Sequence, residues 1–268
     1  MADTVRARTL PRWASLVAIA VAAPVLLFIE YGPPLTDDAV LQPILTMALT
    51  RLIAAAVFLV IFLSQGYHVL HPFRRPYGKS LLFILPPLAV VVNNLPILSL
   101  IWGDAYLVHG EAIYIACFAL ECLAIGLFEE IAFRGVVLLT FAKTRRRTHA
   151  GLLVSILLTS AVFGAMHAVN LLAGAGLPAT IMQIGYSFLI GAMCSVVLFK
   201  TANLWLCVAL HAIYDFCGML LPTLGGGSWW DTPTVIFTVI LAVATTVYLV
   251  VSFFRMSPDE VERIYRQG

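Results

Sequence analysis

Two adjacent carboxylates and a guanidinium lie inside one of the most apolar stretches of the chain. Residues 127–136 read LFEEIAFRGV and contain Glu129, Glu130 and Arg134. At about 100° per residue, Glu130 and Arg134 share one face of a helix, whereas Glu129 points about 100° away from Glu130. We therefore expect Glu130 and Arg134 to pair as supporting residues, which leaves Glu129 free to face another group.

Two further apolar stretches carry histidines at helical spacing. The segment FGAMHAVN spaces Phe163, His167 and Asn170 along one side of a helix. The segment LHAIYD places Asp215 one turn after His211, so that one can orient the other. Polar stripes facing lipid would be penalised, so we expect the stripes to line a polar intramembrane cavity, with Phe163, Asn170 and Asp215 as supporting residues. For either histidine alone, the alternative is an interhelical hydrogen bond with no catalytic role.

Glu129, His167 and His211 together have the composition of a hydrolytic site. A carboxylate can take a proton from water, one imidazole can hold or share that proton, and another can face the developing oxyanion. We therefore predict these three as the catalytic residues. One Glu and two His also suit a catalytic zinc ion, although the sequence contains no HExxH motif. We expect no cofactor, and a divalent metal such as zinc on the same three residues is the alternative.

The composition around these polar groups indicates the class of protein. Of the 268 residues, 61% are hydrophobic and only 11% are charged, and the mean hydropathy is +0.97. A soluble domain needs far less apolar sequence, so we predict an integral, multi-pass membrane protein in contact with the lipid bilayer. The net charge of +2 is too small to favour nucleic acid, and we expect none as a partner. The five cysteines lie in apolar runs without C-x-x-C spacing, which indicates small buried side chains.

Eight apolar stretches are long enough for transmembrane helices, which require about 20 residues each. They lie near residues 13–31, 40–64, 80–102, 112–142, 150–171, 179–199, 203–221 and 233–254. We predict an all-α polytopic fold of about eight transmembrane helices, forming a single transmembrane domain over residues 1–268. The first stretch follows three arginines, and we expect an uncleaved span, with a secretory signal peptide as the alternative.

The charged residues between these stretches separate by sign. The basic residues between and beyond the stretches fall on one side of an eight-span arrangement. The connections on the other side carry no Lys or Arg, only the acids Asp37, Asp38, Asp104, Glu111 and Asp231. Because basic loops favour the cytoplasm, we predict that both termini are cytoplasmic. Arg51 is left inside a span, and we expect it to pair with an acid such as Glu121 or Asp215. Asn93 and Asn94 lie among prolines, which predicts a broken or kinked third helix.

Two further patterns concern connections and depth. The consecutive glycines at residues 225–227 predict a flexible external connection. Counted from the cytoplasmic ends of their stretches, His167 lies about 17 residues deep but His211 only about 8. A shared cavity therefore requires helix tilt or a vertical offset between the two helices.

Three motifs in this order resemble a known family. Residues 129–134 match EExxxR, residues 163–167 match FxxxH, and residues 211–215 match HxxxN with Asp215 in the last place. Over about residues 110–220 the chain resembles the CAAX-protease and bacteriocin-processing family of intramembrane endopeptidases, also called the type II CAAX prenyl endopeptidase or Abi family.

This resemblance implies an eight-helix membrane protease whose catalytic core is that segment. In such a protease Glu129 and His167 would activate a water molecule, and His211 with its partner Asp215 would stabilise the tetrahedral oxyanion. Asp215 departs from the asparagine of the family pattern. Since an ionised carboxylate cannot donate to an oxyanion, Asp215 would have to be protonated or would act by orienting His211.

The residues and the resemblance together predict an intramembrane endopeptidase. This hydrolase would cleave a peptide bond near the membrane surface in a membrane-associated peptide or protein. The alternatives are a proton-coupled membrane transporter, in which the same Glu and His relay protons, and a catalytically inactive membrane scaffold. The expected signature of a transporter is an internal repeat, and the chain holds no second copy of the EExxxR motif.

Overall fold

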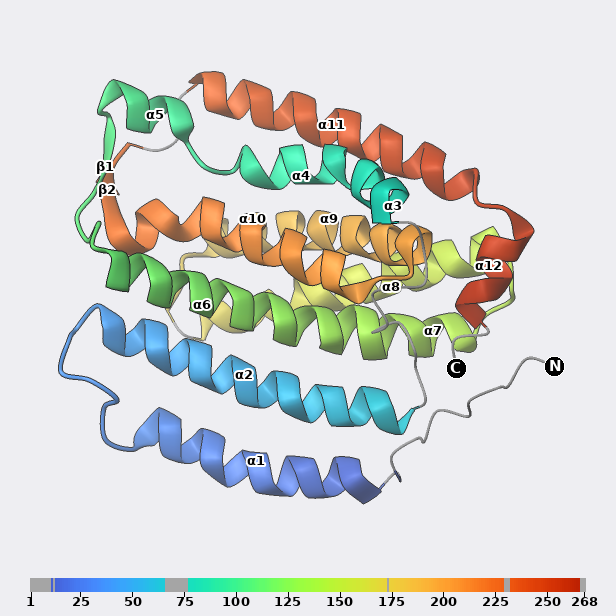
Figure 1. Cartoon of the computed structure of the whole chain (residues 1–268), viewed down its shortest axis with the longest axis horizontal. Helices are drawn as coiled ribbons and strands as arrows, with labels where there is room; N and C mark the ends of the chain where they lie inside the picture. The colour runs from blue at the N-terminus through green and yellow to red at the C-terminus, as the bar shows by residue number, and fades with distance from the viewer. Residues whose placement is uncertain (1–10, 12, 66–76, 173, 229–231, 266–268) are drawn as a thin grey trace.

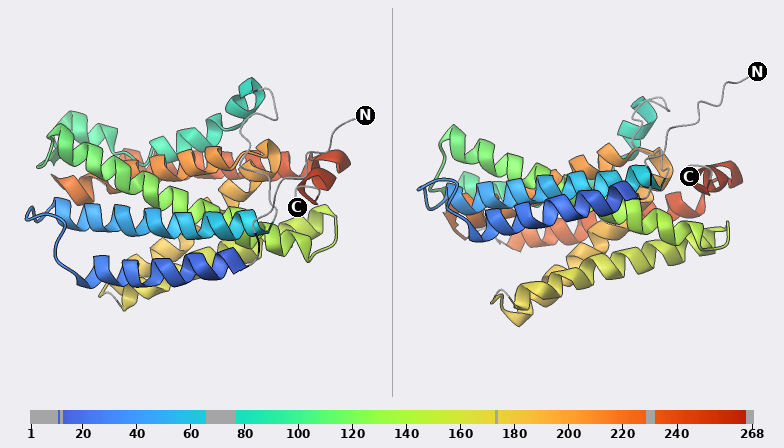
Figure 2. Two further views of the ribbon diagram at one scale, coloured as in Figure 1. Left: turned by 60° about the horizontal axis from the view of Figure 1, so that its bottom comes forward. Right: turned by 90° about the horizontal axis from the view of Figure 1, so that it is seen from below.

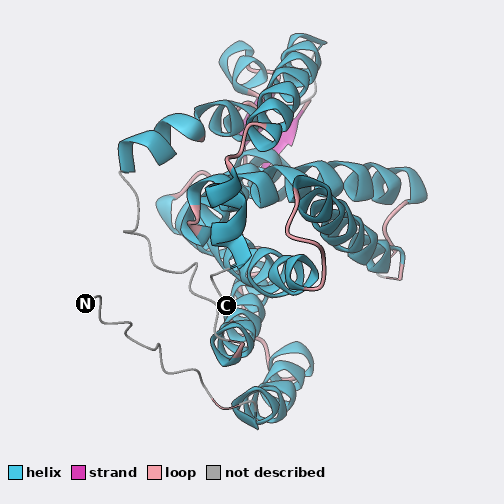
Figure 3. Cartoon of the chain, turned by 90° about the vertical axis from the view of Figure 1, so that its right-hand side faces the viewer, coloured by secondary structure: helices cyan, strands magenta, loops and turns pink. Residues whose placement is uncertain are grey.

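The computed structural model describes residues 11, 13–65, 77–172, 174–228 and 232–265. Long helices run along one common direction, and a short pair of strands closes one end of the bundle (Figures 1 and 2). In chain order the elements are α1 (Trp13–Tyr31), α2 (Leu41–Ser64), α3 (Tyr77–Phe83), α4 (Leu85–Val92), α5 (Ile97–Trp102), β1 (Ala105–Leu107), α6 (Ala112–Glu129), η1 (Glu130–Leu138), α7 (Leu139–Lys143), α8 (His149–Met166), η2 (His167–Leu171), α9 (Leu177–Thr201), α10 (Leu204–Leu224), β2 (Gly225–Gly227), α11 (Thr232–Phe254) and α12 (Pro258–Tyr265). Helix accounts for nearly all of the described chain, as the view roughly along the helix axes shows (Figure 3).

Six helical stretches of the described chain are long and apolar enough to cross a membrane. They are Leu41–Ser64, Ala112–Lys143, His149–Leu171, Leu177–Thr201, Leu204–Leu224 and Thr232–Phe254. The prediction of an all-α, multi-pass membrane protein is therefore confirmed. The count of eight is not confirmed, because the apolar part of α1 is shorter than these six and the third expected span is divided among α3, α4 and α5.

The outer surface has the character that a bilayer requires. On α11, Val239, Val243 and Val247 lie one turn apart and are 57%, 59% and 58% exposed. A soluble protein would bury such a stripe, whereas lipid tails solvate it at no cost.

The break in the third span has a local cause. A proline lies in the first turn of α4, and Pro96 stands immediately before α5. Between them, the side-chain amide of Asn93 donates to Thr238 Oγ1 at 2.9 Å and that of Asn94 donates to the Tyr214 carbonyl at 3.3 Å. The prediction of a broken third helix is confirmed, and these amides bind the interrupted segment to α11 and α10.

The glycine run after α10 is ordered, contrary to the prediction of a flexible connection. Residues 225–227 form β2, which pairs antiparallel with β1 so that Ala105 lies opposite Gly227. The pairing provides partners for backbone groups that a loose connection would leave to solvent. Gly227 has a φ of 95°, and a side chain there would collide with the carbonyl of Asp104, so this position requires glycine.

The helices that carry the polar residues lie in the middle of the bundle. α10 packs between α6 and α4, α2 packs on α6, and α1 lies outside α2 (Figure 1). Buried apolar side chains of α8, α9, α10 and α11 form the largest core cluster together with η1. The polar side chains described below are therefore held by close packing on several sides.

The turn between α9 and α10 lies inside the protein. Asn203 is 6% exposed and Leu204 is fully buried, and Asn203 Oδ1 accepts a hydrogen bond from the Trp205 amide at 2.9 Å. At the same end, α12 is attached to α9 by an ion pair between Lys200 and Glu260 at 3.1 Å. Because α10 begins at a buried turn, few residues precede its histidine, which accounts for the unequal depths that the sequence suggested.

Candidate active site

The EExxxR motif spans the junction between α6 and a π-helix. The π-helix η1 begins at Glu130 and continues α6 without a break. Its amides bond five residues back. Such segments are rare in proteins overall, and those that occur are often found at functional sites. Glu130 and Arg134 in this segment are both 0% exposed. The segment thus carries two charged side chains into the protein interior.

The predicted pair between Glu130 and Arg134 is confirmed. Arg134 Nη1 lies 3.1 Å from Glu130 Oε1, and the guanidinium carbon lies 4.5 Å from the ring centroid of Phe163. The ion pair and the aromatic face together offset part of the cost of burying the cation. Gly191 leaves room for this packing, because a Cβ there would lie 3.3 Å from both Arg134 Nη2 and the Phe163 ring.

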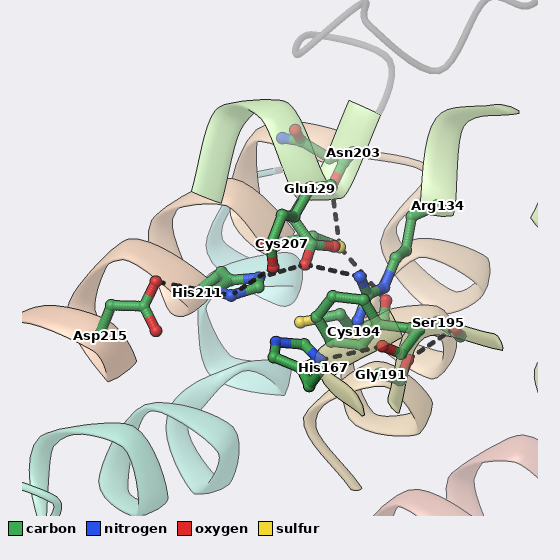
Figure 4. Close-up of polar contacts among 12 residues, drawn as sticks. Glu129, Arg134, His167, Gly191, Cys194, Ser195, Asn203, Cys207, His211 and Asp215 are labelled. Atoms are coloured by element: carbon green, nitrogen blue, oxygen red, sulfur yellow. Dashed lines mark hydrogen bonds and ion pairs between the residues drawn. The ribbon is translucent and has the colours of Figure 1, made fainter. Parts of the chain in front are cut away.

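His211 connects this buried pair to two further carboxylates (Figure 4). Its Nδ1 donates to Glu130 Oε1 at 2.6 Å. Its Nε2 lies 3.4 Å from Glu129 Oε2 and 3.6 Å from Asp215 Oδ2. The first contact is a short hydrogen bond that fixes the imidazole, whereas the other two are longer than a strong one. Glu129 therefore points away from Arg134 and toward α10, as the helical geometry predicted.

His167 lies at the start of η2, and its ring packs against Phe163. Its Nδ1 bonds to the Phe163 carbonyl at 3.0 Å, and because a carbonyl only accepts, Nδ1 is the donor. In the neutral ring, Nε2 then carries the lone pair. The Phe163 ring lies 5.2 Å from the His167 ring and 5.9 Å from the His211 ring, centroid to centroid. η2 and α10 thus bring both imidazoles against one aromatic side chain. No hydrogen bond or salt bridge among the described residues joins His167 directly to Glu129.

Asn170 lies in the short turn that continues from the helix of Phe163. The α-helix ends at Met166, and the following residues form the tighter 3₁₀ turn η2. Within that turn the Asn170 amide donates to Gln183 Oε1 on α9 at 2.7 Å. In a 3₁₀ turn residues i and i+3 lie on the same side, so Asn170 stays in line with His167. Asn170 also connects η2 to α9 through this hydrogen bond.

The carboxylates differ in access. The side chains of Glu129 and Asp215 are 15% and 19% exposed, whereas that of Glu130 is fully enclosed and that of His211 is 5% exposed. A water molecule or substrate can therefore reach Glu129 and Asp215 but not Glu130.

A glycine that the motif reading missed permits the contact between the two helices. A Cβ at Gly126 would lie 3.1 Å from both the Ala212 nitrogen and the Val208 carbonyl oxygen, so the backbones of α6 and α10 touch at this position. Gly126 precedes Glu129 by one turn, and Ala212 follows His211. The close approach is what places the acid beside the imidazole. A glycine one turn before a polar motif in a membrane helix was the signal that could have revealed it.

The five cysteines are free, and all except Cys117 are buried, as predicted for small apolar side chains. Two of them border the site, where the Cys207 thiol donates to the Cys194 carbonyl at 3.2 Å. In the described part of the chain, no group of three or more His, Cys, Asp or Glu side chains is arranged to hold a metal ion. Glu129 contacts His211, and His167 packs on the Phe163 ring that also faces His211, but the three do not form such a group.

A family model matches the middle of the chain. Residues 111–217 match the family model described as Type II CAAX prenyl endopeptidase Rce1-like. The matched segment extends from just before α6 into α10, and it contains Glu129, His167 and His211. The resemblance drawn from the three motifs is thereby confirmed. No curated protein and no solved structure matches the chain.

Proposed function

Residues 111–217 match a family of proteases, and on this premise we propose that the protein is an intramembrane endopeptidase. Its substrate is a membrane-associated peptide or protein, and the bond that it hydrolyses lies near the membrane surface. The observation that carries the proposal is the position of Glu129, a partly accessible carboxylate 3.4 Å from the His211 imidazole within an apolar span.

In the proposed reaction, a water molecule bridges Glu129 and His167 Nε2. The lone pair of Nε2 and the Glu129 carboxylate both accept hydrogen bonds from water, so they orient its oxygen toward a substrate carbonyl. Glu129 takes one proton while the water oxygen forms a bond to the carbonyl carbon. The carbonyl oxygen becomes an oxyanion. When the carbon–nitrogen bond breaks, Glu129 returns the proton to the leaving amine, so the products are one new carboxyl group and one new amine.

His211 stabilises the oxyanion in this scheme. The three surrounding carboxylates favour the imidazolium form of His211, in which both ring nitrogens carry a hydrogen. Nδ1 donates to Glu130, and the long contacts of Nε2 with Glu129 and Asp215 leave its hydrogen available to a stronger acceptor. We assign Asp215 the role of orienting the imidazole. Its carboxylate, 3.6 Å from His211 Nε2, attracts the Nε2 hydrogen but is too distant for a strong hydrogen bond. Burial supports the reaction because fixed donors act more strongly where water is scarce. No step is assigned to a metal.

The test is cleavage of a membrane-tethered, fluorescently quenched peptide by the full chain in liposomes. We expect Glu129→Gln to reduce kcat/KM by about 10³-fold, because a general base is removed with little change in shape. Glu111→Gln is the matched control, since Glu111 precedes the same helix and its side chain makes no capping hydrogen bond. A folded Glu129→Gln protein that cleaves at the wild-type rate would refute the assignment.

The same liposomes separate the other predicted functions. Ion or solute flux without peptide cleavage would favour the proton-coupled transporter, and neither flux nor cleavage would favour the inactive scaffold. Turnover after treatment with a chelator tests the alternative that zinc binds Glu129, His167 and His211. Activity lost to the chelator and restored by zinc would assign these three residues to a metal.

A further inference from the structure

Arg51 and Glu121 carry opposite charges inside neighbouring spans without contacting each other directly. Arg51 lies on α2 and Glu121 on α6, and both are partly buried. Arg51 Nε and Glu121 Oε2 are buried and have no hydrogen-bond partner, and no salt bridge between the two is found among the described residues. Glu121 is nevertheless close enough to Arg51 and to Asp215 for their charges to interact. The expected pairing of Arg51 with an acid is thus present only as a charge interaction at longer range, without a salt bridge.

These two side chains adjoin the proposed reaction centre. The guanidinium carbon of Arg51 lies 5.4 Å from the ring centroid of Phe128, the residue before Glu129. Glu121 precedes Glu129 by about 12 Å along the helix axis. The charges of Glu121 and Asp215 interact, and Asp215 in turn lies 3.6 Å from the His211 imidazole. Glu121 is therefore about as far from Glu129 as three or four residues of an extended peptide would span, at about 3.3 Å each.

A peptide bound within this bundle needs polar side chains that pair with its backbone. Its helical hydrogen bonds must open before the scissile carbonyl becomes accessible, and each freed N–H and C=O costs free energy in apolar surroundings unless the protein pairs it. A peptide group presents one donor and one acceptor. Arg51 supplies an unpaired donor and Glu121 an unpaired acceptor, so together they complement one peptide group.

We propose that Arg51 and Glu121 bind the backbone of the substrate about three residues from the scissile bond. Arg51 donates to a carbonyl oxygen, and Glu121 accepts from an amide N–H. A free carboxylate is a poorer occupant, because it brings no N–H for Glu121 and is repelled by Glu121 and Asp215. This inference rests on the proposed peptidase function and extends it to substrates that bind in extended form.

The test replaces the backbone of the substrate as well as the side chains. A series of otherwise identical membrane-tethered peptides carries an ester in place of one amide, moved one residue at a time, which removes a single N–H. With the wild-type protein we expect one ester position, about three residues from the cleaved bond, to raise KM about tenfold with kcat nearly unchanged. With Glu121→Met, KM for the all-amide peptide should rise by the same factor, and the ester should have no further effect.

Arg51→Met should raise KM about tenfold in the same way, and Arg51→Lys serves if the methionine variant does not fold. Leu52→Ala and Leu120→Ala are the matched controls, since they adjoin the two residues and are 36% and 43% exposed on the apolar surface. KM values that no ester position changes in the wild-type protein would overturn the proposal, and so would variants that lower Tm while KM stays constant. Dependence on a free C-terminal carboxylate, lost on amidation of the peptide, would also overturn it. A wild-type protein that cleaves nothing would contradict the peptidase function itself, whereas normal cleavage with these null results contradicts only the backbone-binding role.

Discussion

Glu129 and Glu130 are adjacent and chemically identical, yet they lie in different surroundings. Glu130 is enclosed, with one oxygen shared between the Arg134 guanidinium at 3.1 Å and the His211 imidazole at 2.6 Å. Glu129 is 15% exposed, and its contact with His211 is 3.4 Å. One carboxylate is thus held on several sides by protein, while the other keeps an open side.

The difference indicates how a membrane helix can give two adjacent acids different roles. The enclosed acid holds the imidazole and the guanidinium through one oxygen, so it contributes position rather than reactivity. The open acid retains space for a water molecule, which is the condition for acid–base chemistry. The enclosed region, defined as Glu130, Arg134 and Phe163, and the open region, defined as Glu129 and Asp215, should therefore respond differently to substitution.

The largest effect is expected from breaking the enclosed region. Arg134→Met leaves the buried Glu130 without its cation, which costs about 3–5 kcal/mol and should lower Tm by about 10 °C or prevent folding. Thermal unfolding in detergent measures this. Arg145→Met, at an exposed position between α7 and α8, is the control and should leave Tm unchanged. A stable but inactive Arg134→Met protein would show instead that Arg134 takes part in the chemistry.

A smaller effect is expected where the two regions depend on the same helix contact. Gly126→Ala introduces a Cβ 3.1 Å from the α10 backbone, and backbone cannot rotate aside. Separation of α6 and α10 should lower kcat by about 10-fold to 100-fold through misplacement of Glu129 relative to His211. Gly185→Ala is the matched control, because a Cβ there meets nothing within 4 Å. Equal kcat for the two alanine variants would mean that the contact does not position the acid.

Within the open region, Asp215 should tolerate a neutral replacement. Asp215→Asn keeps an oxygen that can accept from His211 and adds an amide donor, so kcat/KM should stay within about tenfold of wild type. Steady-state kinetics on the tethered peptide measure this. A loss as large as that expected for Glu129→Gln would assign Asp215 a proton-transfer role and would remove the distinction between the two carboxylates of this region.

The smallest effect concerns a carboxylate outside the spans. The pKa of Asp38 is lowered from its ordinary value of 3.8, first by the Leu41 backbone N–H and then by the Tyr114 hydroxyl. Because the folded-state pKa is depressed, the stabilisation is present above about pH 4 and is lost as the pH falls through the lower folded-state value. Asp38→Asn should lower Tm by about 2 °C at pH 7, and this difference should shrink as the pH falls below about 4. A difference that stays constant with pH would show that the charge is not involved.

The sequence predicted the parts of this site that depend on local geometry. Four-residue spacing was enough to place Arg134 beside Glu130, because both lie within one helical turn. The prolines around Asn93 and Asn94 likewise predicted the broken third helix. In both cases neighbouring residues determine the structure, so no knowledge of distant contacts was needed.

Other features depend on packing that spacing rules cannot represent. No propensity distinguishes the π-helix of η1 from an α-helix, and none marks the 3₁₀ turn that begins at His167. Hydropathy could not give the depth of His211 relative to His167. It takes each span to begin at the membrane surface, whereas α10 begins at a turn that is buried in the protein. The strand pairing of residues 225–227 joins segments more than a hundred residues apart, so local sequence gave no sign of it.

The small sheet at the end of the bundle has a bearing on the distant acid. β1 lies shortly before α6, β2 directly follows α10, and the amides of Val108 and His109 both donate to the Leu224 carbonyl at 2.9 Å. These bonds join the ends of the two helices that carry Glu129 and His211, so neither helix can rotate or slide without disturbing them. The distance between the Glu129 carboxylate and the His211 imidazole therefore depends partly on the β1–β2 pairing at the far end of the molecule. Weakening this pairing would slow the proposed hydrolysis without altering any group that reacts.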